Sequence, residues 1–385
     1  MKTMEQTNNN QKKTNAEHKA SSTRSSIWQR AEQGDPRAQV QLGMRYENTD
    51  PYEASKWYKA AAEQGYAQAQ YLLGLYYYEN DYGVEKSMRE AGKWFRKAAE
   101  QGWGNAQFWL GEWYMCGYPP VKKNEKLAVR WYKKAAKQQD EEAAYSLYFY
   151  YGDSENSDYD PKKSFYWLKL AAQYGQAEAQ KSLAMSYLYG ENVEKSMTKA
   201  VEWFKKAALQ NDEEAQYQLG CYYYFGDGVK QDYSKAVEWF IKAADNENVE
   251  ACQFLGHCYY KGLGVRKNHC KALEWFVKAH NLPKQEYHHI GVLYENEDEK
   301  VSLDDLMEKA KQGDSGAQCI IGLRYYANQK MDEAYKWLCL SAEQNFMSAQ
   351  QYLGYCYYAG LGVNKDESKA LKWFDKATIQ LLELE

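Results

Sequence analysis

A short unit of sequence recurs along almost the whole chain, and this recurrence constrains the fold more than any other feature. Each copy has the form of a helix, a glycine turn and a second helix, as in residues 215–244. When the copies are aligned on a central position, here called the anchor, successive anchors are 31 to 37 residues apart. A period of this length is typical of solenoids built from helical pairs. The ten anchors are Gly43, Gly74, Gly111, Tyr148, Ala184, Gly220, Gly256, Gly291, Gly322 and Gly354.

Three columns of residues around the anchor predict one buried face on the first helix of each pair. Alanine lies five residues before the anchor in every copy except one, where Glu286 replaces it. Leu or Ile lies one residue before the anchor and Tyr three residues after it in all copies. Steps of four residues place these columns on one side of a helix. The second helix carries a Trp that we expect to fill the gap to the next pair, at Trp57, Trp94, Trp131, Trp167, Trp203, Trp239, Trp275, Trp337 and Trp373.

The alternation of Ala-x-x-x-Leu-Gly-x-x-Tyr, Gly-x-Gly-Val and Lys-Ala-x-x-Trp-x-x-Lys-Ala-Ala is similar to the Sel1-like repeat, a relative of the tetratricopeptide repeat. The similarity covers roughly residues 27–378. The resemblance implies an all-α fold, a right-handed α/α superhelical solenoid of about ten helix-turn-helix repeats. It also implies an adaptor or scaffold, with the first helices lining the concave side and the second helices forming the outer side.

The chain divides into four parts by composition. Residues 1–25 are polar and predict a disordered tail, because they bury too little apolar surface to offset the entropy of ordering. A capping helix then opens a block of repeats over 26–295. The acidic stretch 296–301 predicts a break or hinge, and a second short block follows over 302–385. The alternative is one continuous stack with a degenerate repeat.

The last helix carries apolar residues beyond the end of the repeat pattern, at Ile379, Leu381, Leu382 and Leu384. A terminal helix with surplus apolar surface either caps the end of a stack or pairs with another chain. The sequence therefore leaves open a C-terminal cap and a homodimer through this helix.

Positions three residues before, one after and four after the anchor lie almost opposite the expected core face, so we expect them to point into the hollow. Many of them are aromatic, which favours a groove for a peptide or a partner helix. The alternative is that neighbouring first helices approach closely and their rings pack on one another. This predicted groove consists of Tyr71, Leu75, Tyr78, Phe108, Glu112, Met115, Tyr145, Phe149, Met185, Tyr217, Tyr224, His257, Tyr260, Tyr326, Tyr355 and Tyr358.

Charge and hydropathy narrow the class of partner. The formal net charge is −4, and the groove positions include a single cation, Lys181, where phosphate contacts would need many. We therefore expect no nucleic-acid partner, with a helical-repeat RNA binder as the less favoured alternative. No run of 18 apolar residues and no signal-peptide core occurs, which predicts no membrane segment. Together with the resemblance, this predicts a cytoplasmic, bacterial protein.

Catalytic and metal-binding motifs are missing from the pattern. No Gly-x-Ser-x-Gly elbow, phosphate loop or zinc-protease helix occurs, so we expect neither an enzyme nor a cofactor. Cysteines and histidines gather in one region without the spacing of a metal site, and we expect packed or solvated side chains there. A metal-dependent enzyme is the alternative. The residues are Cys252, His257, Cys258, His269, Cys270, His280, His288 and His289.

These observations favour a non-enzymatic scaffold or adaptor, a bacterial regulator that binds a protein or peptide partner in the aromatic groove. An immunity-type protein or an effector delivered into a host cell is the alternative, and each would also act by binding a partner. The pattern does not identify that partner.

Overall fold

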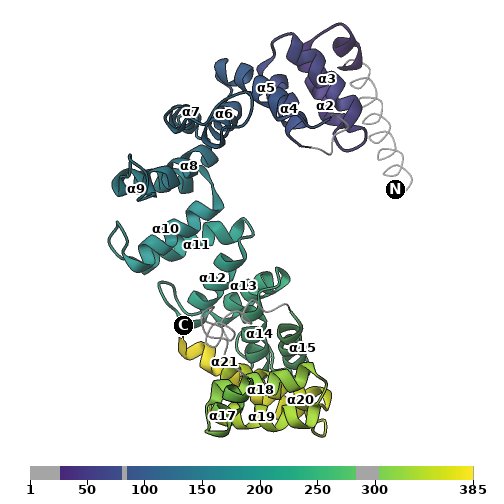
Figure 1. Ribbon diagram of the computed structural model, residues 1–385, viewed down its shortest axis with the longest axis vertical. Helices are drawn as coiled ribbons and strands as arrows, with labels where there is room; N and C mark the ends of the chain where they lie inside the picture. The colour runs from purple at the N-terminus through teal and green to yellow at the C-terminus, as the bar shows by residue number, and fades with distance from the viewer. Residues whose placement is uncertain (1–26, 80–84, 283–302, 385) are drawn as a thin grey trace, which may run out of the picture. The chain divides into compact units, whose positions relative to one another are not determined.

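The structure is a computed structural model that describes residues 27–79, 85–282 and 303–384 (Figure 1). Over these residues the chain consists of α-helices joined by turns and contains no strand. Successive helices form hairpins, which confirms the predicted all-α solenoid of helix-turn-helix repeats. The copy expected around Gly291 lies outside the described residues.

The described residues contain nine helical pairs. A helical segment at residues 27–32 precedes the first pair, and α17 (Leu303–Lys311) precedes the α18–α19 pair. The pairs are α2 (Pro36–Tyr46) with α3 (Pro51–Glu63), α4 (Ala67–Tyr78) with α5 (Met88–Glu100), α6 (Gly104–Cys116) with α7 (Glu125–Ala136), α8 (Glu141–Gly152) with α9 (Pro161–Tyr174), α10 (Ala177–Tyr189) with α11 (Met197–Leu209), α12 (Glu213–Phe225) with α13 (Tyr233–Asp245), α14 (Val249–Lys261) with α15 (His269–Asn281), α18 (Ser315–Ala327) with α19 (Met331–Glu343), and α20 (Met347–Ala359) with α21 (Glu367–Leu384).

The chain forms two compact units, residues 1–179 and 180–385, and each is treated by itself. The first unit contains α2 to α9, and the second contains α11 to α21 with most of α10. The tail at 1–25 and the break at 296–301 lie outside the described residues, so the division expected from composition stays a prediction.

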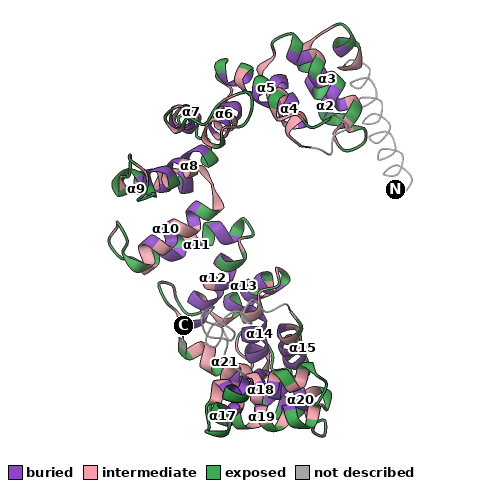
Figure 2. Cartoon of the chain, in the orientation of Figure 1, coloured by how far each residue is buried: buried purple, intermediate pink, exposed green. Residues whose placement is uncertain are grey.

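The anchor glycine sets the distance between the two helices of a pair. A Cβ atom at Gly220 would lie 2.5 Å from the Phe240 ring, and one at Gly43 would lie 2.5 Å from Tyr58. These rings come from the position directly after the Trp, and that position is buried in all nine described pairs. The Trp itself is half-buried in every described pair except α12–α13, where Trp239 is buried, so the core of each pair is closed by the residue that follows the Trp. Figure 2 shows the buried residues along the helices.

A buried glutamine links several pairs to the helix that precedes them, and this contact was not predicted from the sequence. Gln70 Nε2 donates to the carbonyl oxygen of Ala62 at 3.2 Å, and Gln70 Oε1 accepts from Gln101 Nε2 at 2.8 Å. Buried amides need such partners. The sequence contains this recurrence, because Gln directly follows the Ala that lies five residues before the anchor. These residues are Gln39, Gln70, Gln107, Gln180, Gln216, Gln318 and Gln350.

The Gly-x-Gly turns are structural. Gly226 ends α12 in the left-handed conformation, with φ 85°, where residues with a side chain are disfavoured. The second glycine allows a close approach, because a Cβ atom at Gly264 would lie 2.3 Å from the backbone of Tyr233. These loops therefore place Val229 and Val265 against the core clusters.

The C-terminal helix α21 departs from the regular stacking. It has 18 residues, whereas most other second helices have 12 or 13, and it packs against α14 and α15 as well as its own partner α20. Figure 1 shows it in yellow beside α14. The last pair therefore rests on the α14–α15 pair within the second unit.

Candidate functional site

The most exposed part of the predicted groove lies on α8 in the first unit. Phe149 is 57% exposed, which is unusual for a Phe on a regular helix. Its ring centroid lies 4.8 Å from that of Tyr145 and 4.9 Å from that of Tyr148. Tyr148 occupies the anchor position, where most other pairs have glycine. We call Tyr145, Tyr148 and Phe149 the α8 aromatic patch.

The groove residues on α4 and α6 are half-buried, because rings of the next first helix and of their own second helix pack against them. The ring centroid of Tyr78 lies 5.0 Å from that of Trp109 on α6. Tyr71 packs near Phe95 and Trp103, and Phe108 packs near Tyr132. Leu75 and Met115 are also half-buried. Ring packing between first helices, the alternative considered from sequence, therefore accounts for part of this surface.

Glu112 has a structural partner. Its Oε1 accepts a hydrogen bond of 2.5 Å from Tyr132 Oη, and Tyr132 is the ring that packs against the anchor Gly111. Burial, with the charge of Glu112 nearby, raises the pKa of Tyr132 above its ordinary value. Glu112 therefore links the two helices of the α6–α7 pair through its hydrogen bond with Tyr132.

In the second unit, Tyr217, Tyr224 and His257 are buried rather than open to a partner. The Tyr224 ring centroid lies 5.5 Å from that of Phe254 on the next first helix, and Tyr217 contacts the same ring at 5.9 Å. Burial raises the pKa of Tyr224 above its ordinary value. In this conformation these three residues belong to the core and not to a free groove.

Asp375 on α21 covers His257, and this pair was missed from the sequence. His257 Nδ1 lies 2.7 Å from Asp375 Oδ1, and Lys261 Nζ lies 2.9 Å from Asp375 Oδ2. Burial alone would raise the pKa of Asp375, but the hydrogen bonds from His257 and Lys261 outweigh it, so this pKa lies below its ordinary value. One feature of the sequence could have indicated this pair. Two residues after the Trp, α21 has the acid Asp375, whereas the other described second helices have a base or an apolar residue.

The remaining predicted groove residues are half-buried and scattered over the second unit. Tyr260 stacks near His269 at 5.4 Å, and Tyr326 meets Tyr352 at 5.5 Å. Tyr355 stacks on His280 with centroids 3.9 Å apart, and Tyr358 lies 6.1 Å from Tyr355. Met185 packs against the core cluster of α10 to α12. Each of these side chains therefore packs against a neighbouring side chain of the second unit.

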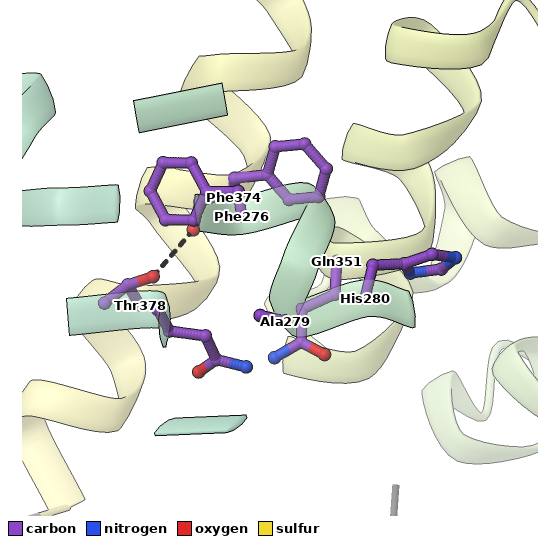
Figure 3. Close-up of a pocket in the computed structure, with 7 residues that line it drawn as sticks. Phe276, Ala279, His280, Gln351, Phe374 and Thr378 are labelled. Atoms are coloured by element: carbon purple, nitrogen blue, oxygen red, sulfur yellow. Dashed lines mark hydrogen bonds between the residues drawn. The ribbon is translucent and has the colours of Figure 1, made fainter. Parts of the chain in front are cut away.

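A small pocket lies where α14 and α15 meet α20 and α21 (Figure 3). Equivalent positions of the two pairs face each other there. Phe276 and Phe374 each follow the Trp of their pair, and their rings are stacked with centroids 5.2 Å apart. Gln253 and Gln351 each lie three residues before their anchors. The lining consists of Gln253, Phe276, Ala279, His280, Gln351, Phe374 and Thr378.

The cysteines and histidines of this region lie on α14 and α15 as far as the structure describes them. Within the part of the chain that is described, no three His, Cys, Asp or Glu side chains gather as metal ligands would. Burial raises the pKa of Cys252 to about 11 and that of Cys258 to about 12, so both stay protonated thiols at neutral pH. His288 and His289 lie outside the described residues.

Charge on the groove positions is neutralised locally. Lys181 Nζ lies 3.2 Å from Asp212 Oδ2 and 3.3 Å from Glu214 Oε2. A lysine engaged by two carboxylates offers little to a phosphate backbone. In addition, none of the described helices is long and apolar enough to cross a membrane.

Comparison with known proteins agrees with the repeat pattern. The sequence model of the Sel1 repeat matches the chain nine times, over well more than half of its length. A comparison with curated protein sequences finds no significant match. The matched segments are 36–66, 67–103, 104–140, 142–175, 177–212, 213–248, 249–281, 322–346 and 348–380.

Solved structures of bacterial proteins are among those similar to this chain. A protective antigen of uropathogenic Escherichia coli with an SLR fold is 32% identical, with a TM-score of 0.60 over 92% of this chain and 78% of that chain. A Sel1 repeat protein of Oxalobacter formigenes is 31% identical, with a TM-score of 0.52 over 63% of this chain and 98% of that chain. An immunity protein of Pseudomonas aeruginosa is 20% identical, with a TM-score of 0.33 over 55% of this chain and 80% of that chain.

Proposed function

The chain belongs to the Sel1 repeat family, and from this premise we propose that it is a non-enzymatic bacterial adaptor that holds a segment of a protein partner against the aromatic face of its first helices. Sel1 repeat proteins generally mediate protein–protein interactions, and their fold is typically a scaffold without catalytic activity. A regulator, an immunity-type protein and a host-delivered effector would all use this mechanism and differ in the partner.

The observation that carries the proposal is the α8 aromatic patch. Three rings lie within contact of one another on one helix, and the Phe149 ring is mostly exposed. Leaving the Phe149 ring in water is unfavourable, and rigid aromatic side chains supply binding energy with little loss of rotamer entropy. The patch therefore suits an apolar segment of a protein.

A protein partner fits the charges better than RNA does. Reading single-stranded RNA requires cations beside the stacking rings. Lys181 is the one cation among the groove positions and is held by Asp212 and Glu214. Rings without such cations favour a peptide or helix.

Affinity capture from the native cell tests the proposal. We expect a protein that is retained by the wild-type chain to be lost with a Tyr145→Ala, Phe149→Ala double variant. The matched control is Tyr166→Ala, because Tyr166 is 52% exposed on α9, the second helix of the same pair. Circular dichroism confirms that all three chains remain helical.

Equal recovery by the wild-type chain and the double variant, with loss on Tyr166→Ala, would place binding on the second helices instead. Either pattern identifies the partner by mass spectrometry, and a partner that is a toxin would favour the immunity-type alternative over a regulator.

A further inference from the structure

The C-terminal helix α21 buries the acidic side chain of Asp375 against His257 and Lys261 of α14. Both carboxylate oxygens of Asp375 have cationic or hydrogen-bonding partners, since Oδ1 meets His257 and Oδ2 meets Lys261. The side chains of His257 and Asp375 are 7% and 8% exposed. Burying a carboxylate destabilises a protein unless it is paired in this way. The surface of α14 is therefore selective for a carboxylate at this point.

Asp375 has no part in the repeat architecture. It lies two residues after the Trp, and no other described pair has an acid at that position. The residues there are Lys59, Arg96, Lys133, Lys169, Lys205, Ile241, Val277 and Cys339. The acid therefore serves the contact with α14 rather than the stability of the α20–α21 pair.

Apolar residues of α21 extend the contact towards α12. Leu381 and Leu382 pack against the aromatic cluster that contains Tyr217 and Tyr224. Thr378 is buried and lines the small pocket beside α14 (Figure 3). Asp375, Thr378 and Leu382 are three and four residues apart, so they lie on one stripe of the helix. This spacing is that of a helix bound in a groove.

We propose that the surface of α12 and α14 is a binding site for an acidic amphipathic helix of a protein partner, and that α21 occupies this site in the absence of the partner. This inference rests on the proposed function and specifies its partner chemistry. The bound helix presents a carboxylate to His257 and Lys261 and an apolar side chain seven residues later to the cluster around Tyr217, as α21 does.

A peptide copy of α21 tests the site without knowledge of the natural partner. The probe is a fluorescent peptide of residues 367–384, added to the full-length chain and followed by anisotropy. In the Asp375→Ala chain, the resident helix has lost its carboxylate, so we expect this chain to bind the peptide at least about tenfold more tightly than the wild-type chain does. Hydrogen exchange should be faster in α14 and at the end of α21 of the Asp375→Ala chain than in the wild type.

Matched peptides and chains establish what the site recognises. A Glu383→Ala peptide should bind as the unchanged peptide does, because Glu383 is exposed on the same helix. An Asp375→Ala peptide should bind at least about tenfold more weakly, and so should the unchanged peptide when His257→Ala and Lys261→Ala are added to the Asp375→Ala chain.

Three results would overturn the proposal: unchanged hydrogen exchange in the Asp375→Ala chain, no peptide binding by that chain once exchange has risen, or equal binding of the Asp375→Ala and Glu383→Ala peptides. None of these results depends on the α8 aromatic patch or on a cellular partner. Failure here would therefore leave the proposed function to be judged by the capture experiment alone.

Discussion

At the scale of single residues, seven of the nine described pairs have a glycine at the anchor of the first helix, and in each of them this glycine contacts a ring or a Leu side chain of the second helix. In the α12–α13 pair, Phe240 lies where a Cβ atom on Gly220 would be, and Phe240 is completely buried. Glycine is a poor helix former, costing about 1 kcal/mol relative to alanine. Its presence in mid-helix therefore reflects the space that the ring requires.

Gly220→Ala should destabilise the protein even though alanine favours helix. The new methyl group would lie 2.5 Å from the Phe240 ring, and such overpacking typically costs about 1 to 3 kcal/mol. We expect a lower urea midpoint by circular dichroism. The control is Gly104→Ala, because a Cβ atom there would meet only Gln138 at 3.5 Å and should be neutral or stabilising. A Gly220→Ala chain as stable as wild type would show that the pair separates without cost.

The sequence could predict these columns but not every side chain that completes them. Periodicity identifies the face on which a residue lies. It does not distinguish Trp203 from Phe204, since both border the core and the direction of the side chain decides that Phe204 is enclosed while Trp203 is half-buried. Nor does it reveal the hydrogen bond from Gln70 to Ala62, because that partner belongs to the preceding pair.

At the scale of elements, α21 differs from the other second helices by what it touches. Its first turns pair with α20 as the repeat requires, while Asp375 and the residues after it contact α14 and its aromatic cluster. The buried ion pair makes this contact sensitive to protonation. Tyr224 on α12 also faces Asp375, in addition to His257 and Lys261 on α14.

Asp375→Asn should destabilise the chain at pH 7 by about 1.5 to 3 kcal/mol, the usual worth of a hydrogen bond to a charged group. Because the pKa of Asp375 is lowered by folding, its stabilisation is present above about pH 4 and is lost as the pH falls through the folded value. The difference in urea midpoint between variant and wild type should therefore shrink between pH 4 and pH 2. The control is Glu383→Gln, because Glu383 is an exposed acid on α21. Its urea midpoint should equal that of the wild type at pH 4 and at pH 2. A difference in urea midpoint between Asp375→Asn and wild type that does not change with pH would contradict an ionised Asp375.

The position of α21 could not be predicted from sequence. The surplus apolar residues indicated that the last helix covers something, but a cap and a homodimer fitted equally well. His257 and Asp375 are 118 residues apart, and each fits an ordinary helix in its own repeat. Only the contact between α21 and α14 explains why α21 has an acid at position 375 and α14 has a histidine at position 257.

At the scale of the whole molecule, the second unit contains a contact that a linear array lacks. In a solenoid each repeat touches only its neighbours, so stability is a sum of local terms. Here the last pair packs on α14 and α15, and equivalent residues of the two pairs meet, as Phe276 does with Phe374. The α14–α15 pair is therefore coupled to a pair that is distant in sequence.

Substitution of the two histidines of α15 separates this coupling from ordinary stacking. His280 stacks on Tyr355 of α20 with centroids 3.9 Å apart, whereas His269 stacks near Tyr260 of the adjacent α14. Loss of a ring contact worth about 0.5 to 1.5 kcal/mol should raise amide exchange about two- to tenfold in the helix that it touches. We therefore expect His280→Ala to speed exchange in α20 and His269→Ala to leave α20 unchanged, as measured by mass spectrometry. Unaltered amide exchange in α20 of the His280→Ala chain would mean that the contact between α15 and α20 does not stabilise α20. The stability of each pair in the second unit would then depend only on its neighbours in sequence.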